Sequence, residues 1–231
     1  MNASRMCMRL AFGNERGKLP WFIFFNIVIM ETSEIIPMQV QGKFNDLEET
    51  YTAADVADAI IVFERAVQRL KHPACWHTIA GVLSAAFLLV DHTGHELHRP
   101  GNEDDLIRID VPGPGPATGD GYDWVRITRM EEKTDKQTDQ KRFAMRLESC
   151  PTPGNRTGES AHFFKTGASS TFMIERTGKT VTTSYHGRNE VSNTDTVSVV
   201  DNLRNAVIGI AALAGVSELQ WKALLKGFLQ E

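Results

Sequence analysis

Cysteine is scarce in this sequence. Its 231 residues include only three, Cys7, Cys75 and Cys150, and no two of them form a Cys-x-x-Cys pair. An odd and widely spaced set excludes a disulfide framework and a zinc knuckle, and it makes a reducing compartment the default. We expect Cys75 and Cys150 to be small buried hydrophobic residues rather than reactive thiols.

An excess of positive charge is also absent. The chain has 25 lysines and arginines against 29 aspartates and glutamates, which gives a formal net charge of -4. Because phosphate binding needs a basic surface, this balance argues against a nucleic-acid-binding protein. The one dense charge run, Glu131–Arg142, is mixed in sign, and we expect it to be a solvated loop.

No apolar run is long enough to span a bilayer. The most apolar stretch, Trp21–Met30, has ten residues, whereas a membrane-spanning helix needs about 20. With 42% hydrophobic residues, a chain of this length can form a core without disulfides or metals. The sequence therefore predicts one soluble globular domain with no membrane span.

The first 29 residues differ in composition from the rest. They hold four lysines and arginines ahead of the apolar stretch, as a secretory signal does, but no small-x-small cleavage site follows. The alternative is an upstream start, with Met30 as the true first residue. We predict that residues 1–29 lie outside the fold and that residues 30–231 form a single domain. We expect a cytoplasmic protein, or an exported one if residues 1–29 act as a signal segment.

Strand and helix patterns follow one another at the start of the domain. A rough alternation predicts a strand at Ile35–Phe44, and its proline confines that strand to an edge or a strand start. We expect the polar stretch Asn45–Thr50 to be a connection. A Thr52–Asp55 capping box and apolar residues at helical spacing then predict a helix over residues 52–71.

The apolar segment Cys75–Val90 is ambiguous by periodicity, because its alanines favour a helix and its branched residues suit a buried strand. We favour a strand at Ala86–Asp91 with an irregular or helical lead-in.

The second half of the domain is rich in strand and turn patterns. Regular alternation predicts strands, and stretches rich in glycine or proline predict the connections between them. The predicted strands are Leu106–Val111, Tyr122–Met130, Lys141–Ser149 and the two arms of a hairpin over Ser170–Arg188; the main loop is Pro112–Gly121. Helical spacing from Val197 to Ala211 predicts a helix that Gly215 ends, and Ser217 caps a second one.

This order of elements predicts an α+β fold. Strands linked by hairpins, with helices at both ends, indicate an antiparallel, curved sheet of five to seven strands with one N-terminal and two C-terminal helices. The order resembles that of the START-like helix-grip domains, in which a curved sheet grips a long C-terminal helix. That resemblance rests on element order and implies a fold rather than an activity.

Three histidines, His92, His95 and His98, lie within seven positions beside Asp91 and Glu96. Imidazole and carboxylate groups are natural ligands for zinc, iron or manganese. The spacing does not match His-Glu-x-x-His, and the intervening glycine breaks a helix. We therefore favour a polar loop after a buried strand, and the three histidines remain weak metal-ligand candidates.

The segment His186–Glu190 lies where the clearest hairpin ends. His186, Arg188 and Glu190 stand beside a glycine on a strand scaffold that would hold them in place. Arg188 could bind a carboxylate or phosphate through two hydrogen bonds, while His186 or Glu190 transfers a proton. The alternative is a solvated strand end with an Arg–Glu pair of little energetic consequence.

The proline- and glycine-rich loop ends near Asp120 and Trp124, which we include among the ligand-binding candidates. Its glycines allow close approach of a ligand to the backbone, and the alternative is a structural connection. The sequence has no Gly-x-Ser-x-Gly elbow, phosphate loop or Gly-x-Gly-x-x-Gly.

Three functions remain. A non-catalytic binding module ranks first: a small apolar or anionic ligand would lie in an apolar pocket between the sheet and the C-terminal helix. The expected lining is Met145, Phe172, Met173 and Tyr185, with His186, Arg188 or Glu190 at the mouth. A partner-binding protein that forms a homodimer through Trp221 and Phe228 ranks second, and a metal-assisted or acid/base hydrolase third. The residues identify no cofactor.

Overall fold

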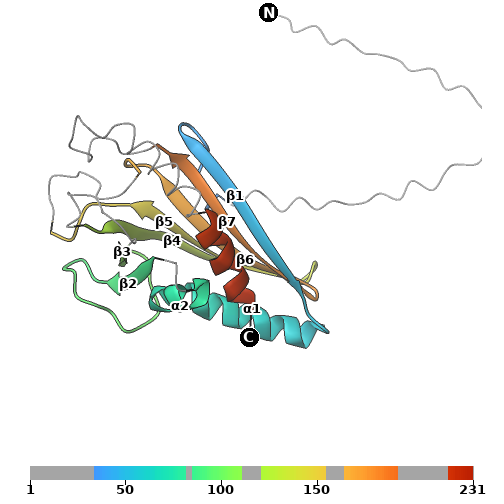
Figure 1. The fold of residues 1–231 in the computed structure, drawn as a ribbon. Coiled ribbons are helices and arrows are strands. Elements are labelled where there is room, and N and C mark those ends of the chain that lie inside the picture. Colours follow the sequence, from blue (N-terminus) through green and yellow to red (C-terminus); the bar gives the residue numbers. More distant parts are fainter. Residues whose placement is uncertain (1–33, 82–84, 111–120, 155–163, 192–217, 231) are drawn as a thin grey trace, which may run out of the picture. The chain divides into compact units, whose positions relative to one another are not determined.

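Seven strands form one antiparallel sheet in the described part of the chain, residues 34–81, 85–110, 121–154, 164–191 and 218–230 of the computed structural model. The strand order is β1-β7-β6-β5-β4-β3-β2. The strands are β1 (Lys43–Thr52), β2 (Ala86–Val90), β3 (Leu106–Asp110), β4 (Asp123–Asp135), β5 (Gln140–Ser149), β6 (Ser169–Thr177) and β7 (Thr180–Glu190). Figure 1 shows the helices on one side of this curved sheet.

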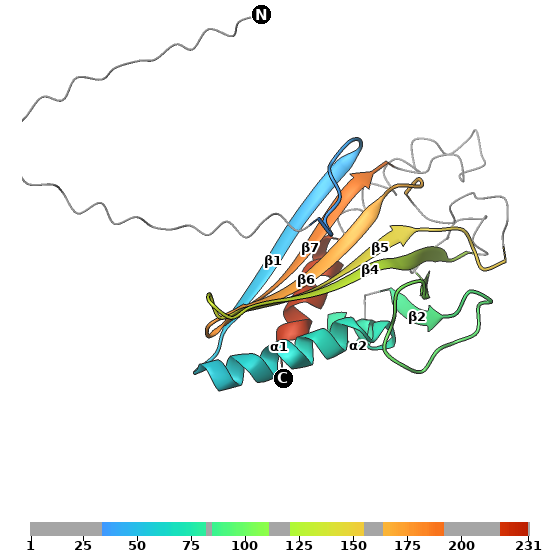
Figure 2. The same ribbon diagram turned by 180° about the vertical axis from the view of Figure 1, so that it is seen from behind.

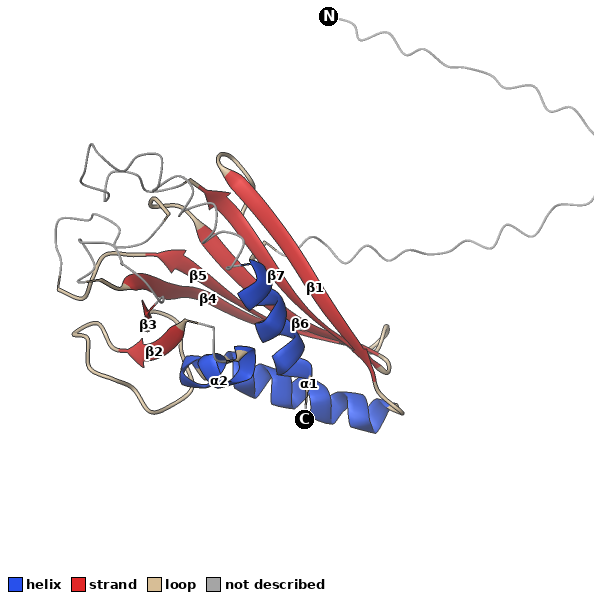
Figure 3. Ribbon diagram, viewed as in Figure 1, coloured by secondary structure: helices blue, strands red, loops and turns tan. Residues whose placement is uncertain are grey.

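Helices α1 (Val56–Leu70) and α2 (Trp76–Ala80) connect β1 to β2, with the short 3-10 helix η1 (Pro73–Cys75) between them. A further helix over residues 218–229, called here the C-terminal helix, packs with α1 against the same face of the sheet. Figure 2 shows these elements from behind, and Figure 3 colours them by secondary structure. The predicted α+β fold is therefore confirmed, including the helix against the inside of the sheet that the helix-grip resemblance implies. The predicted helix before Gly215 and residues 1–29 lie outside the described residues.

The first strand was placed wrongly by the sequence pattern. It runs over Lys43–Thr52, so most of it comes from the polar stretch that we expected to be a connection. Leu47 is its one buried residue, which leaves too little alternation to identify a strand. Charged side chains on an edge strand are a common protection against pairing with another chain, and β1 lies at the sheet edge beside β7.

Helix α1 begins at Val56, four residues later than predicted. Its N-cap is Asp55, whose side chain accepts a hydrogen bond from the Asp58 backbone N–H. Thr52 pairs with Thr180 in the sheet and is not free to cap. The lead-in to β2 is helical and β2 follows over Ala86–Val90, as predicted.

The charge run Glu131–Arg142 is mostly strand, not the solvated loop that we expected. β4 continues to Asp135 and β5 starts at Gln140. Glu131 explains the extension, because its carboxylate lies 3.5 Å from the Arg142 guanidinium on β5 and 3.2 Å from Lys133 Nζ on β4. Opposite charges on one face of a strand pair stabilise the ladder, which a pattern of apolar residues cannot show.

The inner face of the sheet, the one that packs against the helices, carries the core. Trp76 is fully buried at its centre and lies 5.1 to 6.3 Å, between ring centroids, from Phe87, Phe172 and Phe228. Its indole N–H donates to the Arg69 carbonyl at 3.0 Å. Burying an aromatic side chain of this size contributes on the order of 2–3 kcal/mol, so this cluster fixes the helices on the sheet.

Two arginines of α1 hold the end of the C-terminal helix. Arg69 Nη1 donates to the carbonyls of Gly227 and Gln230, and Arg65 Nη2 donates to that of Leu229. The last carbonyls of a helix have no partner within the helix, so these side chains supply one and also complement the helix dipole. None of the described helices is long and apolar enough to cross a bilayer.

The outer face, opposite the helices, has its own smaller clusters. Trp124 packs there with Val90, Leu106 and Cys150. Cys150 is buried as predicted, and its burial raises the pKa of the thiol to about 11, which keeps it unreactive. Cys75 was expected to be buried but is exposed.

Candidate functional site

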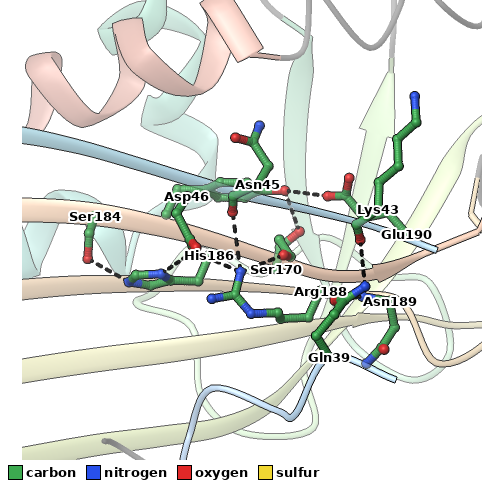
Figure 4. A network of polar contacts seen from close by, with 12 residues as sticks. Gln39, Lys43, Asn45, Asp46, Ser170, Ser184, His186, Arg188, Asn189 and Glu190 are labelled. Carbon is green, nitrogen blue, oxygen red and sulfur yellow. Dashed lines mark hydrogen bonds and ion pairs between the residues drawn. The ribbon is translucent and has the colours of Figure 1, made fainter. Parts of the chain in front are cut away.

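The end of β7 presents polar side chains to both faces of the sheet. Side chains alternate along a strand, so Tyr185 points to the inner face, while Ser184, His186 and Arg188 point to the outer face. Figure 4 shows this region. The sequence suggested one binding rim at His186–Glu190, and the structure places His186 and Arg188 in one group and Glu190 in another, with Tyr185.

The inner group is a hydrogen-bonded chain of three side chains. The Tyr185 hydroxyl donates to Glu190 Oε1 at 3.3 Å and lies 3.1 Å from Ser170 Oγ on β6. Tyr185 is 2% exposed. A buried phenol is therefore paired with a half-buried carboxyl group on the inner face of the sheet.

Glu190 reaches the inner face because the strand turns at its end. Simple alternation would place it with His186 and Arg188, but Asn189 has a left-handed φ of 58° and redirects the chain. The Glu190 carboxylate then fills the space beside Gly187, where a Cβ would collide with Oε1 and lie 3.1 Å from the Tyr185 hydroxyl. Glycine at 187 leaves the space that the Glu190 carboxylate fills.

Asn189 is itself held by the segment before β1. Its Oδ1 accepts from the Val40 backbone N–H at 2.7 Å, and its Nδ2 donates to the Met38 carbonyl at 3.1 Å. The Gln39 side chain accepts from the Asn189 N–H at 2.9 Å. Asparagine tolerates the left-handed region better than most residues do, and these bonds keep it there.

Burial controls the protonation of the inner group. It raises the pKa of the Glu190 carboxyl despite the Tyr185 hydrogen bond and the positive charges of Lys43 and Arg188. It raises the pKa of Tyr185 as well, and the nearby Glu190 adds to that shift. The Tyr185 phenol therefore stays protonated and acts as a hydrogen-bond donor.

A small cavity adjoins this chain. Its lining is Val125, Leu147, Phe164 and Ala168 with Ser149, Ser169, Ser170 and Glu190. Its volume of about 10 Å³ accommodates at most one water molecule. Next to it, the Trp221 ring of the C-terminal helix stacks on Tyr185 at 5.3 Å and 16°. The predicted lining residues Met145, Phe172 and Tyr185 share this face, whereas Met173 lies in a cluster with Ile35 and Ala144 on the outer face.

The outer group is centred on Asp46 of β1, which lies opposite His186 in the sheet register. Asp46 Oδ1 is 2.6 Å from His186 Nδ1 and 2.7 Å from Arg188 Nη1. His186 Nε2 lies 3.1 Å from Ser184 Oγ. Burial alone would raise the Asp46 pKa, but the hydrogen bonds from Arg188 and His186 outweigh it and the pKa is lowered.

The other sequence candidates lie apart from both groups. Asp120 is outside the described residues, and Trp124 belongs to the outer-face cluster with Cys150. His95 and His98 are more than four-fifths exposed, and their side chains lie near different carboxylates, Asp91 and Glu96. No three histidine, cysteine, aspartate or glutamate residues are placed to hold a metal ion in the part of the chain described.

The Asp91 side chain organises the histidine loop. It accepts hydrogen bonds from Thr93 and from the His95 N–H, and the bond from the Thr93 side chain contributes most to lowering its pKa to about 2. The loop follows β2, as predicted, and its geometry is that of an aspartate-centred turn.

Sequence reasoning missed Asp46, Ser170 and Ser184. Asp46 lies 140 positions from His186, so only the pairing of β1 with β7 brings them together. Ser170 and Ser184 stand in strands whose alternation was visible, and their faces could have been assigned by counting from Phe172 and Tyr185.

Comparison with known proteins gives structural likenesses only. No protein-family model and no curated protein sequence matches the chain. The chain is similar to the structure of TTHA0849 from Thermus thermophilus, with 14% identity, a TM-score of 0.36, and coverage of 81% of this chain and 94% of the other. It is also similar to the structure of Ms6760 from Mycobacterium smegmatis, with 17% identity, a TM-score of 0.33, and coverage of 82% of this chain and 98% of the other. For the structure of Ara h 8.0201 the identity is 14% and the TM-score 0.32, with coverage of 82% of this chain and 100% of the other. At such TM-scores these likenesses carry no argument about function.

Proposed function

We propose that the protein is a binding module for a small, mainly apolar ligand, held on the inner face of the sheet beside Glu190. The observation that carries this proposal is the Ser170–Tyr185–Glu190 chain next to a cavity, in which Tyr185 is buried and the other two residues are half-buried. Buried polar groups in a core that only has to pack are costly unless each is paired. A polar chain at the edge of an apolar cavity is the usual composition of a ligand site.

Glu190 has bonding capacity that the chain itself does not use. Its Oε1 accepts the Tyr185 hydroxyl, while Oε2 accepts no hydrogen bond from the described residues. A carboxylate has lone pairs for further donors. The ligand that fits is therefore one with a hydroxyl or amine group that donates to Glu190, and the carboxylate disfavours the anionic ligand that the sequence left open.

Trp221 is the residue that has to move. The cavity is smaller than any organic ligand, and Trp221 is partly exposed and stacked on Tyr185, whereas Trp76 is fully buried and hydrogen-bonded. A ligand that displaces the Trp221 ring gains the face of Tyr185 as its apolar contact. Trp221 also contacts Phe87 and Phe172, and each aromatic pair contributes about 0.5–1.5 kcal/mol, so the ligand has to replace three such contacts.

The test is a titration of the full chain with the neutral apolar dye Nile red, together with native mass spectrometry of the protein as purified. We expect one dye site. We also expect Glu190→Gln to weaken the binding of any co-purified ligand that donates a hydrogen bond to Glu190 by about tenfold. Thr182→Ala, on the outer face of the same strand, is the matched control. Absence of both dye binding and bound mass would overturn the proposal, as would a ligand that binds Glu190→Gln as tightly as the natural chain.

A further inference from the structure

Three side chains on the outer face stand in the order of a nucleophile, a base and an orienting carboxylate. Ser184 Oγ is 3.1 Å from His186 Nε2, and His186 Nδ1 is 2.6 Å from Asp46 Oδ1 (Figure 4). We propose that Ser184, His186 and Asp46 form a nucleophilic triad that accepts an acyl group from a small activated ester. The site is on the opposite face from the proposed ligand site and is independent of it.

The assignment of the imidazole nitrogens supports this order. A carboxylate accepts only, so Asp46 fixes the proton on Nδ1 and leaves Nε2 with a lone pair directed at the serine hydroxyl. This is the tautomer that a general base needs in order to take the serine proton. The arrangement rests on strand register, since Asp46 and His186 are paired residues of β1 and β7 and Ser184 lies two residues along the same face.

The surroundings keep the carboxylate charged. Arg188 Nη1 lies 2.7 Å from Asp46 Oδ1 and is itself held by the Gly187 carbonyl at 2.8 Å. An ionised Asp46 stabilises the imidazolium that forms when His186 takes a proton. Arg188 lies two residues beyond His186 on the same face, and its guanidinium is bound to Asp46 rather than to Ser184.

The reaction balances without a further reagent. Ser184 Oγ attacks the acyl carbon while His186 Nε2 takes the hydroxyl proton, and the bond to the leaving oxygen breaks as the imidazolium returns that proton. Water then attacks the acyl-serine with His186 as base, which releases the carboxylic acid and restores the serine. Ser184 is only 6% exposed, which restricts access to a small acyl group such as acetyl.

The absence of a backbone oxyanion hole limits the rate. β7 is paired with β1 on one side and β6 on the other, so the backbone N–H groups around Ser184 belong to the ladder. Side-chain donors have to stabilise the oxyanion instead, and this contribution is usually the largest single one. We therefore expect acylation by an ester with a good leaving group and little turnover of ordinary esters.

The experiment treats the full chain with 4-nitrophenyl acetate and follows nitrophenol release, with the acetyl adduct located by peptide mass spectrometry. We expect an adduct on Ser184 that Ser184→Ala abolishes. His186→Gln should slow its formation by about 100-fold or more, and Asp46→Asn by more than about tenfold. Thr182→Ala, two residues from Ser184 on the same face, should react like the natural chain, and thermal melts establish that each variant is folded.

Three results would overturn the triad: no adduct, an adduct that maps to another residue, or an adduct on Ser184 that forms as fast in folded His186→Gln. Each of these outcomes leaves the Nile red titration unaffected, so failure of the triad and failure of the inner-face site are distinguishable.

Discussion

The two faces of β7 place polar groups in contrasting environments. On the inner face, Tyr185 stacks against Trp221 of the C-terminal helix and donates to Glu190, and burial raises the pKa of both groups. On the outer face, Asp46 is 45% exposed and its pKa is lowered by hydrogen bonds from Arg188 and His186. The pKa values of two carboxyl groups at one end of the sheet thus shift in opposite directions, because desolvation dominates for Glu190 and the hydrogen bonds from Arg188 and His186 dominate for Asp46.

This contrast shows how little sequence distance says about chemical environment. His186 and Glu190 are four positions apart, yet they lie on opposite faces because of the left-handed Asn189. His186 and Asp46 are 140 positions apart and in contact. A candidate site taken from one short segment therefore mixes groups that belong to different sites.

The largest difference between the faces should be in stability. Phe172 is 1% exposed on the inner face and contacts Trp76, Tyr185 and Trp221. We expect Phe172→Ala to lower the free energy of unfolding by about 3–5 kcal/mol, because it removes apolar area and leaves a cavity. Urea unfolding measures this. Thr182→Ala on the outer face should change it by less than about 1 kcal/mol, and equal losses would mean that the core is not where we place it.

The docking of the C-terminal helix provides the next test. Gly227 packs so closely on α2 that a Cβ would collide with the Ile79 side chain and lie 2.7 Å from the Ile79 carbonyl oxygen. We expect Gly227→Ala to cost about 1–3 kcal/mol through overpacking, although alanine is the better helix former. Lys226→Ala, one exposed position away, is the control. A stabilised Gly227→Ala, measured by the same unfolding curves, would show that this contact is not tight.

A matched pair of buried threonines gives the smallest effects. Thr183 and Thr171 are both 0% exposed. Thr183 Oγ1 donates to the Leu225 carbonyl at 3.0 Å on the inner face, whereas Thr171 Oγ1 has no partner among the described residues. We expect Thr183→Val to cost about 1–2 kcal/mol, and Thr171→Val to be neutral or stabilising by up to about 1 kcal/mol. Thermal or urea unfolding measures both variants. If both substitutions lowered the free energy of unfolding, the assignment of a hydrogen bond to Thr183 and none to Thr171 would be contradicted.

Local patterns identified much of the sheet before the structure. The β6–β7 hairpin and strands β2 and β3 were predicted because alternating apolar residues and glycine turns are local signals. The strand β1 was not, since its pairing with β7 depends on charged side chains and on one buried leucine. The extension of β4 to Asp135 was missed for the same reason, because ion pairs with β5 hold it in the sheet.

The candidate site was predictable in part. His186, Arg188, Glu190 and Tyr185 were identified from their place at a strand end, and the structure describes all four. Their division into two groups was not predictable, because it depends on the positive φ of Asn189 and on the bonds from Gln39 and Val40. Those contacts join residues that are about 150 positions apart.

The pH dependence of stability tests the contrast between the two carboxyl groups most directly. Urea unfolding of the natural chain, Glu190→Gln and Asp46→Asn would be compared between about pH 3 and pH 7, which spans the ordinary carboxyl pKa values. The raised folded-state pKa of Glu190 means that the natural chain should lose stability relative to Glu190→Gln as the pH rises above about 4.5. The lowered pKa of Asp46 means that the natural chain should lose stability relative to Asp46→Asn as the pH falls below about 4. Opposite slopes are the expected result. If the two differences in the free energy of unfolding changed with pH in the same direction, or if the difference for Glu190→Gln did not change with pH, the separation of these groups onto a buried and a charged face would be contradicted.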